Sequence, residues 1–527
     1  MESAASAPSN ADAVREDGDP RKWKILAAVV FGVFMVILDT TVVNVAFPAL
    51  REAFDAPLHT AQWVLSAYVL ALGVATPLAG FLGDRFGMRT TYAAGLALFT
   101  LGSLLCGVAP SLELLIAARV LQGLGGGIAT PLGSAHLFRA FPPNQQGTAL
   151  GLFGVALTLA PASGPLLGGW LVTHGLWRWI FFVNVPIGIV GVVLASRWLR
   201  NHKREHPPKL AWSSVALTTV GFGSMLYAST VAADHGWASP EVLGGFAVGV
   251  AALAAFTVQA LRSPDPLLDV RLFGNRTFAN AALIGYVSVL ALFGAEFLMP
   301  LYLQMLRGLT AFEAGMTLLP MALASGITTP LAGRIYDKIG PRALLIVGYG
   351  LLAFNTWQFA HLTGDTPLST IRWLLVVRGV ALGLTVQTTF TTALGVVPPQ
   401  NVGRASSLIN ATRFVVQAVS VALLATLLTA YLSPEMQAAA AHEGSAQVVA
   451  GGLCTKTPPP AAAAQLAEAC AENLEGFDAA YMATFWASVA ALLLGSMLPG
   501  WPGRWSGREG LRGTVGPGGP PPALSQA

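Results

Sequence analysis

Charged residues stand inside long apolar stretches of the sequence, and Asp39 and Arg119 are two of them. In a lipid environment such residues usually pair with each other or line a water-filled cavity. At a helical rise of about 1.5 Å per residue, both lie roughly 4–8 Å from the middle of their stretches, on the same side. We therefore expect Asp39 and Arg119 to be neighbours.

A neighbouring arginine would keep the Asp39 carboxylate ionised, and a movement that disturbs the pair would let the carboxylate take a proton. This chemistry suits a proton-coupled step. The alternative is a fixed ion pair that only orients two helices.

Three further charges need an explanation. Glu296 lies at a similar depth, and it could carry a second proton, anchor a cationic substrate or face a watery vestibule. Arg378 has no obvious acidic partner except Glu296. For Arg413 we favour a side chain that extends to the membrane interface.

The elements that hold these charges must be membrane-spanning helices. Of 527 residues, 54% are hydrophobic and 11% are charged, whereas soluble domains carry about 25% charged residues. A spanning helix needs about 20 apolar residues, and barrel strands would instead alternate. Fourteen stretches qualify: 25–48, 61–83, 90–109, 112–136, 147–173, 177–197, 211–232, 241–261, 278–304, 314–334, 341–361, 370–396, 404–431 and 478–499.

The distribution of positive charge orients these helices. With the N-terminus inside, 22 of the 30 Lys and Arg residues fall in cytoplasmic segments, five fall outside and three fall within spans. Short cytoplasmic loops carry such an excess. The expectation is a multi-pass protein of the cell membrane with both termini in the cytoplasm.

The sequence also repeats itself, which predicts the fold. Asp84 returns as Asp337 at an offset of 253 residues, and Arg119 returns as Arg378 at 259. Paired halves around a midplane site are typical of alternating-access transporters. We predict an all-α membrane protein of two six-helix bundles, with two extra helices inserted between them.

The predicted segments follow from this repeat. A cytoplasmic tail (1–24) precedes the first bundle (25–197), and a basic linker with two helices (198–277) precedes the second bundle (278–499). The second bundle includes a long outer loop (432–477), and a Gly- and Pro-rich tail (500–527) is expected to be disordered. Within the outer loop, Cys454 and Cys470 could form a disulfide in an oxidising compartment or stay as free thiols.

Two glycine-containing motifs suggest conformational roles. A gating motif follows the second span and comprises Gly80, Gly83, Asp84, Arg85, Gly87 and Arg89. Asp84 could accept bonds at a helix end or pair with an arginine from another span, and thereby lock an inner gate; a plain structural turn is the alternative. A second motif, in the fifth span, contains Pro161, Gly164, Pro165, Gly168 and Gly169. Prolines bend helices and small residues allow close packing, so this span is either a bendable seal or a packing surface.

Polar and aromatic side chains within spans are candidates for a substrate cavity, although packing within the core is the alternative for most of them. These candidates are Asn44, Trp63, Tyr68, Asn184, Asn355, Gln358, Gln387, Asn410 and Gln417. No GxxxxGK[ST] sequence occurs, so ATP is not expected to be the direct energy source. The histidines show no metal-binding spacing. We expect no cofactor, no metal and no nucleic-acid partner.

Four segments together resemble a known family. They are LDTTVVNVAFPAL (38–50), GFLGDRFGMR (80–89), RVLQGLGGG (119–127) and APASGPLLGGWL (160–171). The sequence is similar in them to the major facilitator superfamily, and within it to the fourteen-span drug:proton antiporters of the EmrB/QacA kind. The last segment departs from that family's antiporter motif at Ala160, where the motif usually has glycine.

The resemblance implies a transporter that exports amphipathic or cationic small molecules, such as drugs, in exchange for protons. A specific exporter or symporter of one metabolite and a transport-inactive membrane sensor are the alternatives, and an enzyme is not expected. The implied partners are a small-molecule substrate, protons and the lipid bilayer. A periplasmic adaptor protein would join them if the host has an outer membrane.

Overall fold

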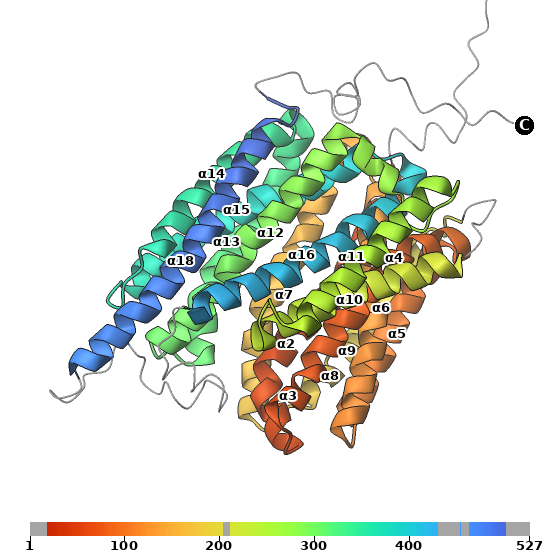
Figure 1. Cartoon of the computed structure of the whole chain (residues 1–527). Helices are drawn as coiled ribbons and strands as arrows, with labels where there is room; N and C mark the ends of the chain where they lie inside the picture. Colours follow the sequence, from red (N-terminus) through yellow and green to blue (C-terminus); the bar gives the residue numbers. More distant parts are fainter. Residues whose placement is uncertain (1–17, 204–210, 431–453, 455–462, 502–527) are drawn as a thin grey trace, which may run out of the picture.

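The computed structural model describes residues 18–203, 211–430, 454 and 463–501. Within them, fourteen helical segments are long and apolar enough to cross a membrane, so the predicted number of spans is confirmed. Figure 1 shows these helices as two bundles with a further helix pair against them. The predicted all-α fold class is therefore correct.

The first bundle consists of six long helices and two short ones. Its members are α2 (Lys22–Ala53), α3 (Leu58–Ala61), α4 (Trp63–Phe86), α5 (Met88–Val108), α6 (Leu112–Ala140), α7 (Gln146–Thr173), α8 (Trp179–Phe182) and α9 (Asn184–Trp198). Glycines let α6 approach its neighbours closely. A Cβ atom at Gly123 would collide with the Tyr68 carbonyl of α4, and one at Gly125 with the Phe99 backbone of α5.

The second bundle repeats this arrangement. Its members are α12 (Arg276–Leu301), a π-helical turn η3 (Tyr302–Leu306), α13 (Ala311–Ile339), α14 (Pro341–Ala360), α15 (Leu368–Gly395), α16 (Val402–Ala430) and α18 (Ala463–Ser496). The turn after the second long helix is alike in both bundles. Gly87 and Gly340 both have positive φ, of 95° and 82°, a conformation that favours glycine.

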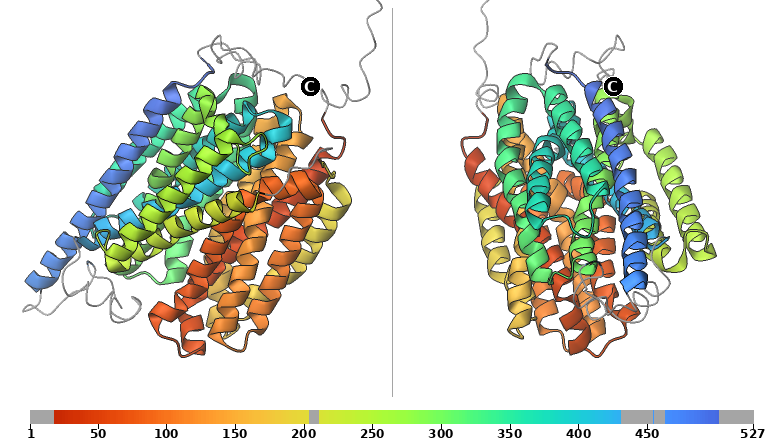
Figure 2. Two further views of the ribbon diagram at one scale, coloured as in Figure 1. Left: turned by 45° about the vertical axis from the view of Figure 1, so that its right-hand side comes forward. Right: turned by 90° about the vertical axis from the view of Figure 1, so that its left-hand side faces the viewer.

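The two inserted helices are α10 (Trp212–His235) and α11 (Pro240–Arg262). Helix α10 packs against α4 of the first bundle and α16 of the second, and α11 packs mainly on α10. Figures 1 and 2 show the pair on one side of the molecule, outside both bundles. The insertion therefore lies against the junction of the bundles and does not separate them.

The bundles meet chiefly through α7 against α13 and α4 against α16. The hydrogen bonds between the two bundles cluster at one end of the molecule, where α4 and α13 end and α7 and α16 begin. We call this end the terminal face. In Figure 1 the opposite ends of the bundles, marked by α3 and by the start of α18, lie well apart. The structure is thus closed at the terminal face.

Several boundaries differ from the sequence prediction. Helix α18 begins at Ala463, so part of the predicted loop 432–477 is helical. The Ala-rich stretch favours a helix, and its acidic residues had excluded it from the apolar span. The predicted sixth span is divided at Val183 into α8 and α9. Residues 1–17 of the predicted N-terminal tail, 204–210 of the linker, 432–453 and 455–462 of the loop and 502–527 of the C-terminal tail lie outside the described residues.

Candidate functional site

Asp39 of α2 and Arg119 of α6 form an ion pair inside the first bundle. The Arg119 Nη1 atom lies 2.5 Å from Asp39 Oδ2, and both side chains are wholly buried. The Arg119 Nε atom also donates to the Val64 carbonyl of α4 at 3.0 Å. A buried pair of this kind is held by geometry and by additional hydrogen bonds, since desolvation costs offset much of the attraction.

Two amides complete the surroundings of the Asp39 carboxylate. Gln122 Nε2 and Asn184 Nδ2 each donate to Asp39 Oδ1 at 2.8 Å. Gln122 also accepts from Arg119 Nη1 at 2.8 Å, and Asn184 donates to Ser103 Oγ at 3.1 Å. The carboxylate therefore has donors from α6 and α9, and the network extends to α5.

Tyr68 closes this network from α4. The Arg119 guanidinium lies over the Tyr68 ring, 4.0 Å from its centre, in a cation–π contact. The Tyr68 hydroxyl donates to the Val36 carbonyl at 3.2 Å, and the side chain is wholly buried. The prediction that Tyr68 lines a substrate cavity is wrong for this conformation, because its ring packs under Arg119.

At the terminal face, Asp84 meets the second bundle. Asp84 Oδ2 accepts a hydrogen bond from Arg404 Nε of α16 at 2.8 Å, and both side chains are buried. Arg404 Nη1 also donates to the Pro266 carbonyl at 3.0 Å, in the segment that follows the inserted helices. Next to the pair, the Gly80 amide donates to Ser407 Oγ at 2.9 Å. Asp84 therefore pairs with an arginine of another span, as one of the two sequence hypotheses proposed.

The rest of the gating motif shapes this contact. A Cβ atom at Gly80 would collide with the Arg404 backbone, and one at Gly83 would press on Leu132 of α6. Arg85 lies beside the Phe86 ring, 5.6 Å from its centre, and Arg89 is partly exposed in the first turn of α5. Gly80 thus allows α4 to approach α16, and Gly83 allows it to approach α6.

The repeat places Asp337 in the corresponding position of the second bundle. Its carboxylate accepts from the Gly147 amide at 2.8 Å and from the Thr148 amide and hydroxyl at 2.9 Å and 2.7 Å. Because these amides begin α7, the helix dipole also favours the acid. Thr148 and Arg404 are 256 residues apart, so they occupy equivalent positions in the repeat. Each aspartate therefore contacts the first turn of the equivalent helix in the opposite bundle, α16 for Asp84 and α7 for Asp337.

The fifth-span motif lies within α7 and faces α2 in part. A Cβ atom at Gly164 would collide with Thr41, and one at Gly168 would press on Val42 and Val45. Gly169, by contrast, has open space around it. Pro161 and Pro165 fall within the same helix. The glycines at 164 and 168 therefore serve the α2–α7 contact.

Arg378, the repeat partner of Arg119, has different surroundings. It is wholly buried and donates through Nη2 to the Ala291 carbonyl at 2.7 Å and to the Leu292 carbonyl at 3.2 Å. Its Nη1 donates to Thr356 Oγ1 at 3.2 Å. Among the described residues Arg378 forms no ion pair. Backbone carbonyls of α12 thus take the place that the Asp39 carboxylate has in the first bundle.

Glu296 lies on α12 near Arg378 and Arg413. Its side chain is exposed, although it stands in the membrane-spanning part of the helix. Arg378 and Arg413 are both within electrostatic range of its carboxylate. Within the described part of the chain, neither arginine forms an ion pair with it. Glu296 is therefore an exposed acid within electrostatic range of two arginines.

Arg413 does not extend to a membrane interface, so our favoured interpretation of it was wrong. It lines a pocket in the second bundle together with Tyr286, Ser288 and Tyr349. The cavity volume of this pocket is about 30 Å³. An arginine in the middle of α16 therefore faces a hollow within the protein.

The other cavity candidates take varied positions. Asn355 is wholly buried and donates to the Leu374 carbonyl at 2.7 Å, so its assignment to a cavity is wrong here. Gln387 donates across the bundles to the Leu150 carbonyl at 3.0 Å, and Asn410 bonds to the Ser406 carbonyl of its own helix at 2.8 Å. Trp63 stacks on Tyr227 of α10.

Three of the remaining polar candidates are not enclosed. Asn44 is exposed, whereas Gln417 and Gln358 are partly buried. The network around Asp39 instead contains Asn184, which is wholly buried.

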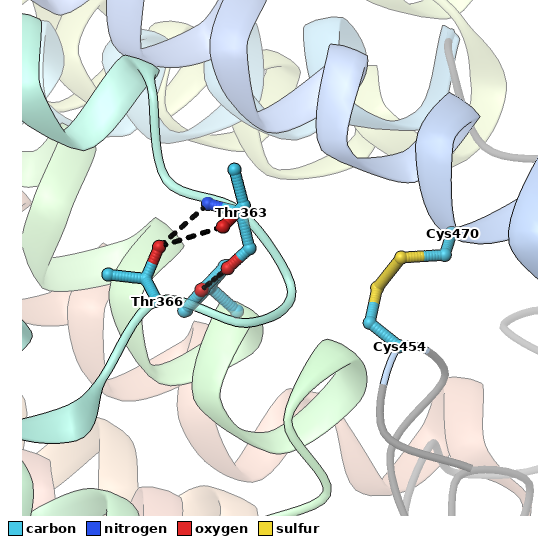
Figure 3. Close-up of a disulfide and its surroundings, with 5 residues drawn as sticks. Thr363, Thr366, Cys454 and Cys470 are labelled. Atoms are coloured by element: carbon cyan, nitrogen blue, oxygen red, sulfur yellow. Dashed lines mark hydrogen bonds between the residues drawn. A yellow bond between two sulfur atoms is a disulfide. The ribbon is translucent and has the colours of Figure 1, made fainter. Parts of the chain in front are cut away.

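Cys454 and Cys470 form a disulfide that joins the segment before α18 to that helix. Figure 3 shows the disulfide beside the turn that contains Thr363 and Thr366, between α14 and α15. The Cys454 amide donates to the Leu306 carbonyl at 3.0 Å. The bond thus ties α18 to the end of the second bundle that lies away from the terminal face.

Sequence reasoning missed Gln122 and the role of Arg404. Gln122 lies three residues after Arg119, on the same face of α6, and this spacing could have identified it. Arg404 was counted only among the 22 Lys and Arg residues of the expected cytoplasmic segments. Its repeat partner Thr148 is uncharged, so the repeat gave no sign of a salt bridge.

Comparison with known proteins agrees with this architecture. The sequence model of the Major Facilitator Superfamily matches residues 29–421. The chain is 35% identical over 415 residues to an uncharacterized MFS-type transporter, YhcA, of Bacillus subtilis, covering 79% of this chain and 78% of that protein. It is 31% identical over 469 residues to the multidrug resistance protein B homolog of Mycobacterium tuberculosis, covering 88% and 87%.

A further relative and the solved structures point the same way. The lincomycin resistance protein LmrB of Listeria innocua is 29% identical over 419 residues, covering 80% of this chain and 89% of that protein. The proton:xylose symporter XylE matches in fold with a TM-score of 0.59 at 15% identity, covering 93% of this chain and 98% of that chain. With fourteen spans, two repeated bundles and these matches, the chain belongs to the major facilitator superfamily of membrane transporters.

Proposed function

We propose that this transporter exports amphipathic or cationic small molecules in exchange for protons. The observation that carries the proposal is the Asp39 carboxylate, held inside the first bundle by Arg119, Gln122 and Asn184. A buried acid that can exchange its partners is suited to binding and releasing a proton. The relatives named for multidrug and lincomycin resistance support a drug-like cargo.

In this proposal the terminal face is the cytoplasmic side, with both chain termini there. The excess of Lys and Arg in the loops on that side supports the orientation. The contacts of Asp84 with Arg404 and of Asp337 with Thr148 then close the inner gate. The described conformation is accordingly the outward-facing one.

The exchange follows from these two assignments. A proton from outside adds to a carboxylate oxygen of Asp39, which removes the negative charge that pairs with Arg119. Weakening of this pair accompanies the change to the inward-facing state, in which the inner gate opens and the proton leaves to the cytoplasm. Cargo that binds from the cytoplasm restores the ionised pair and is carried outward. Glu296 is suited to hold the cationic group of the cargo, because its carboxylate is accessible.

The experiment that tests this function measures proton flux. The purified protein is reconstituted in liposomes that contain a pH-sensitive dye, and tetraphenylphosphonium or ethidium is added on one side. Proton movement opposite to the cation, absent from protein-free liposomes, would support the proposal. If no lipophilic cation moves protons, a transporter specific for one metabolite, or a sensor, becomes the better explanation.

A further inference from the structure

The second bundle contains a pocket lined by side chains from four helices. Tyrosine rings, hydroxyl groups and one guanidinium surround it, contributed by Tyr286, Ser288, Tyr349, Thr389, Phe390 and Arg413. These residues belong to α12, α14, α15 and α16. Most of the lining is apolar, with a small number of polar groups, which is the usual composition of a small-molecule site.

The hydroxyl groups of the lining bond to one another. Tyr349 Oη pairs with Ser288 Oγ at 2.5 Å and with Thr389 Oγ1 at 3.2 Å. Tyr286 Oη pairs with Thr412 Oγ1 at 2.6 Å. These groups are therefore satisfied without a ligand and do not hold the guanidinium.

Arg413 is the exception in this lining. Within the part of the chain that the structure describes, no hydrogen bond or ion pair joins its guanidinium to another residue. Its electrostatic neighbours are Glu296 and Tyr349. This contrasts with Arg119, whose guanidinium is engaged by Asp39, Gln122 and Val64. An arginine in a membrane-spanning segment is costly unless it has a partner. The guanidinium of Arg413 has five N–H donors with which it could bind such a partner.

We propose that Arg413 binds an anionic group of the transported molecule, namely a carboxylate, in this pocket. A planar guanidinium matches a carboxylate in two parallel hydrogen bonds. Aromatic groups of the cargo would pack against the rings of Tyr286 and Phe390. Because Glu296 is within electrostatic range of Arg413, a cargo with an amine and a carboxylate could engage both charges. The cargo class thus includes zwitterionic amphipaths as well as cations.

This inference rests on the proposed function, since it names the chemistry of the cargo, but its test does not need proton coupling. Rhodamine B has a free carboxylate and a cationic ring system, and its ethyl ester has the same ring system without the carboxylate. The dissociation constants of both dyes are measured by fluorescence polarisation with purified protein, at equilibrium and without a pH gradient. Failure of proton flux would therefore leave this binding comparison intact.

The wild-type protein should bind rhodamine B about tenfold or more tightly than the ester, which is the effect expected for a hydrogen-bonded charge pair. Arg413→Gln should remove this preference by weakening the binding of rhodamine B alone. Arg413→Lys retains the positive charge but not the planar guanidinium, so it should keep part of the preference for rhodamine B. Arg372→Gln is the matched control, because Arg372 is exposed at the start of α15.

Other results would overturn the proposal. A wild-type protein that binds both dyes equally, or neither, contradicts a carboxylate site. If Arg413→Gln changes the binding of both dyes by the same factor, Arg413 acts as a counter-charge for Glu296 and not as a ligand-binding group. Since the wild-type comparison needs no variant, misfolding of Arg413→Gln would not remove the test.

Discussion

The Arg119 guanidinium lies 2.5 Å from the Asp39 carboxylate, and neither side chain is accessible to water. The two residues come from α6 and α2, and Gln122 and Asn184 supply the remaining hydrogen bonds to the acid. A fully satisfied carboxylate must lose partners before it can bind a proton stably. In the proposed exchange, Asp39 can therefore take up a proton only together with a rearrangement of the first bundle.

The first prediction concerns Asp39→Asn. The amide is close in shape to the carboxylate but has no charge to exchange, so transport driven by a pH gradient should fall to the level of protein-free liposomes. Exchange of labelled for unlabelled cargo, which needs no net proton movement, should persist. Glu52→Gln is the control, because Glu52 is an exposed acid near the end of the same helix. If Asp39→Asn transports normally when driven by a pH gradient, the ion pair of Asp39 and Arg119 has only a structural role.

The second prediction concerns the inner gate. Arg404→Gln removes the arginine that pairs with the buried Asp84 carboxylate, and breaking a buried ion pair typically costs about 3–5 kcal/mol. Since the contact closes the terminal face, the population should shift toward conformations open there. Spin labels can be attached at Thr90→Cys and Lys338→Cys, because both residues are exposed near this face. Double electron–electron resonance should then measure a longer distance between the two labels in Arg404→Gln than in the wild-type protein.

The control for this measurement is Arg197→Gln, because Arg197 is an exposed arginine near the same end of the first bundle. It should leave the label distance unchanged. An unchanged distance in Arg404→Gln as well would show that the Asp84–Arg404 pair does not hold the gate.

The third prediction compares two glycines of the fifth-span motif. A methyl group at Gly164 would collide with Thr41 of α2, whereas Gly169 has space for one. Overpacking of this kind costs about 1–3 kcal/mol. Gly164→Ala should therefore lower the unfolding temperature and the transport rate, and Gly169→Ala should change neither. Equal effects of the two substitutions would contradict the packing role assigned to the motif.

The fourth prediction concerns the disulfide between Cys454 and Cys470. A bridge across 16 residues of sequence stabilises a protein by about 3 kcal/mol in the chain-entropy estimate. Reduction, or Cys454→Ser, should lower the unfolding temperature of the second bundle. Thiol titration of the unreduced, denatured protein should find one free thiol, that of Cys106. Three free thiols would show that the bond does not form.

The sequence predicted the fold and one ion pair because both follow from strong local signals. Long apolar stretches identify the spans, and charges at matching depth identified Asp39 and Arg119. The repeat located Asp337, and the structure shows what that residue binds. These inferences need only periodicity and the cost of charge in lipid.

The remaining partners depend on how helices rotate about their axes, which apolar sequences do not specify. Tyr68 and Asn355 are polar residues in spans, like Asn184, and sequence alone cannot tell which face of its helix each residue occupies. Arg413 was misplaced for the same reason. Arg413 lies about three turns from the start of α16, where a long side chain can extend toward an interface or point into the bundle, and the pocket beside Tyr286 decides between these.

The central claim, that Asp39 carries the exchanged proton, is tested most directly by proton release on binding. Purified protein in weakly buffered detergent solution is mixed with tetraphenylphosphonium, and the change in pH is followed with a soluble indicator. The wild-type protein should release protons as the cation binds, and Asp39→Asn should bind the cation with no release. If Asp39→Asn releases as many protons as the wild-type protein, another group carries the proton and this account of the site is wrong.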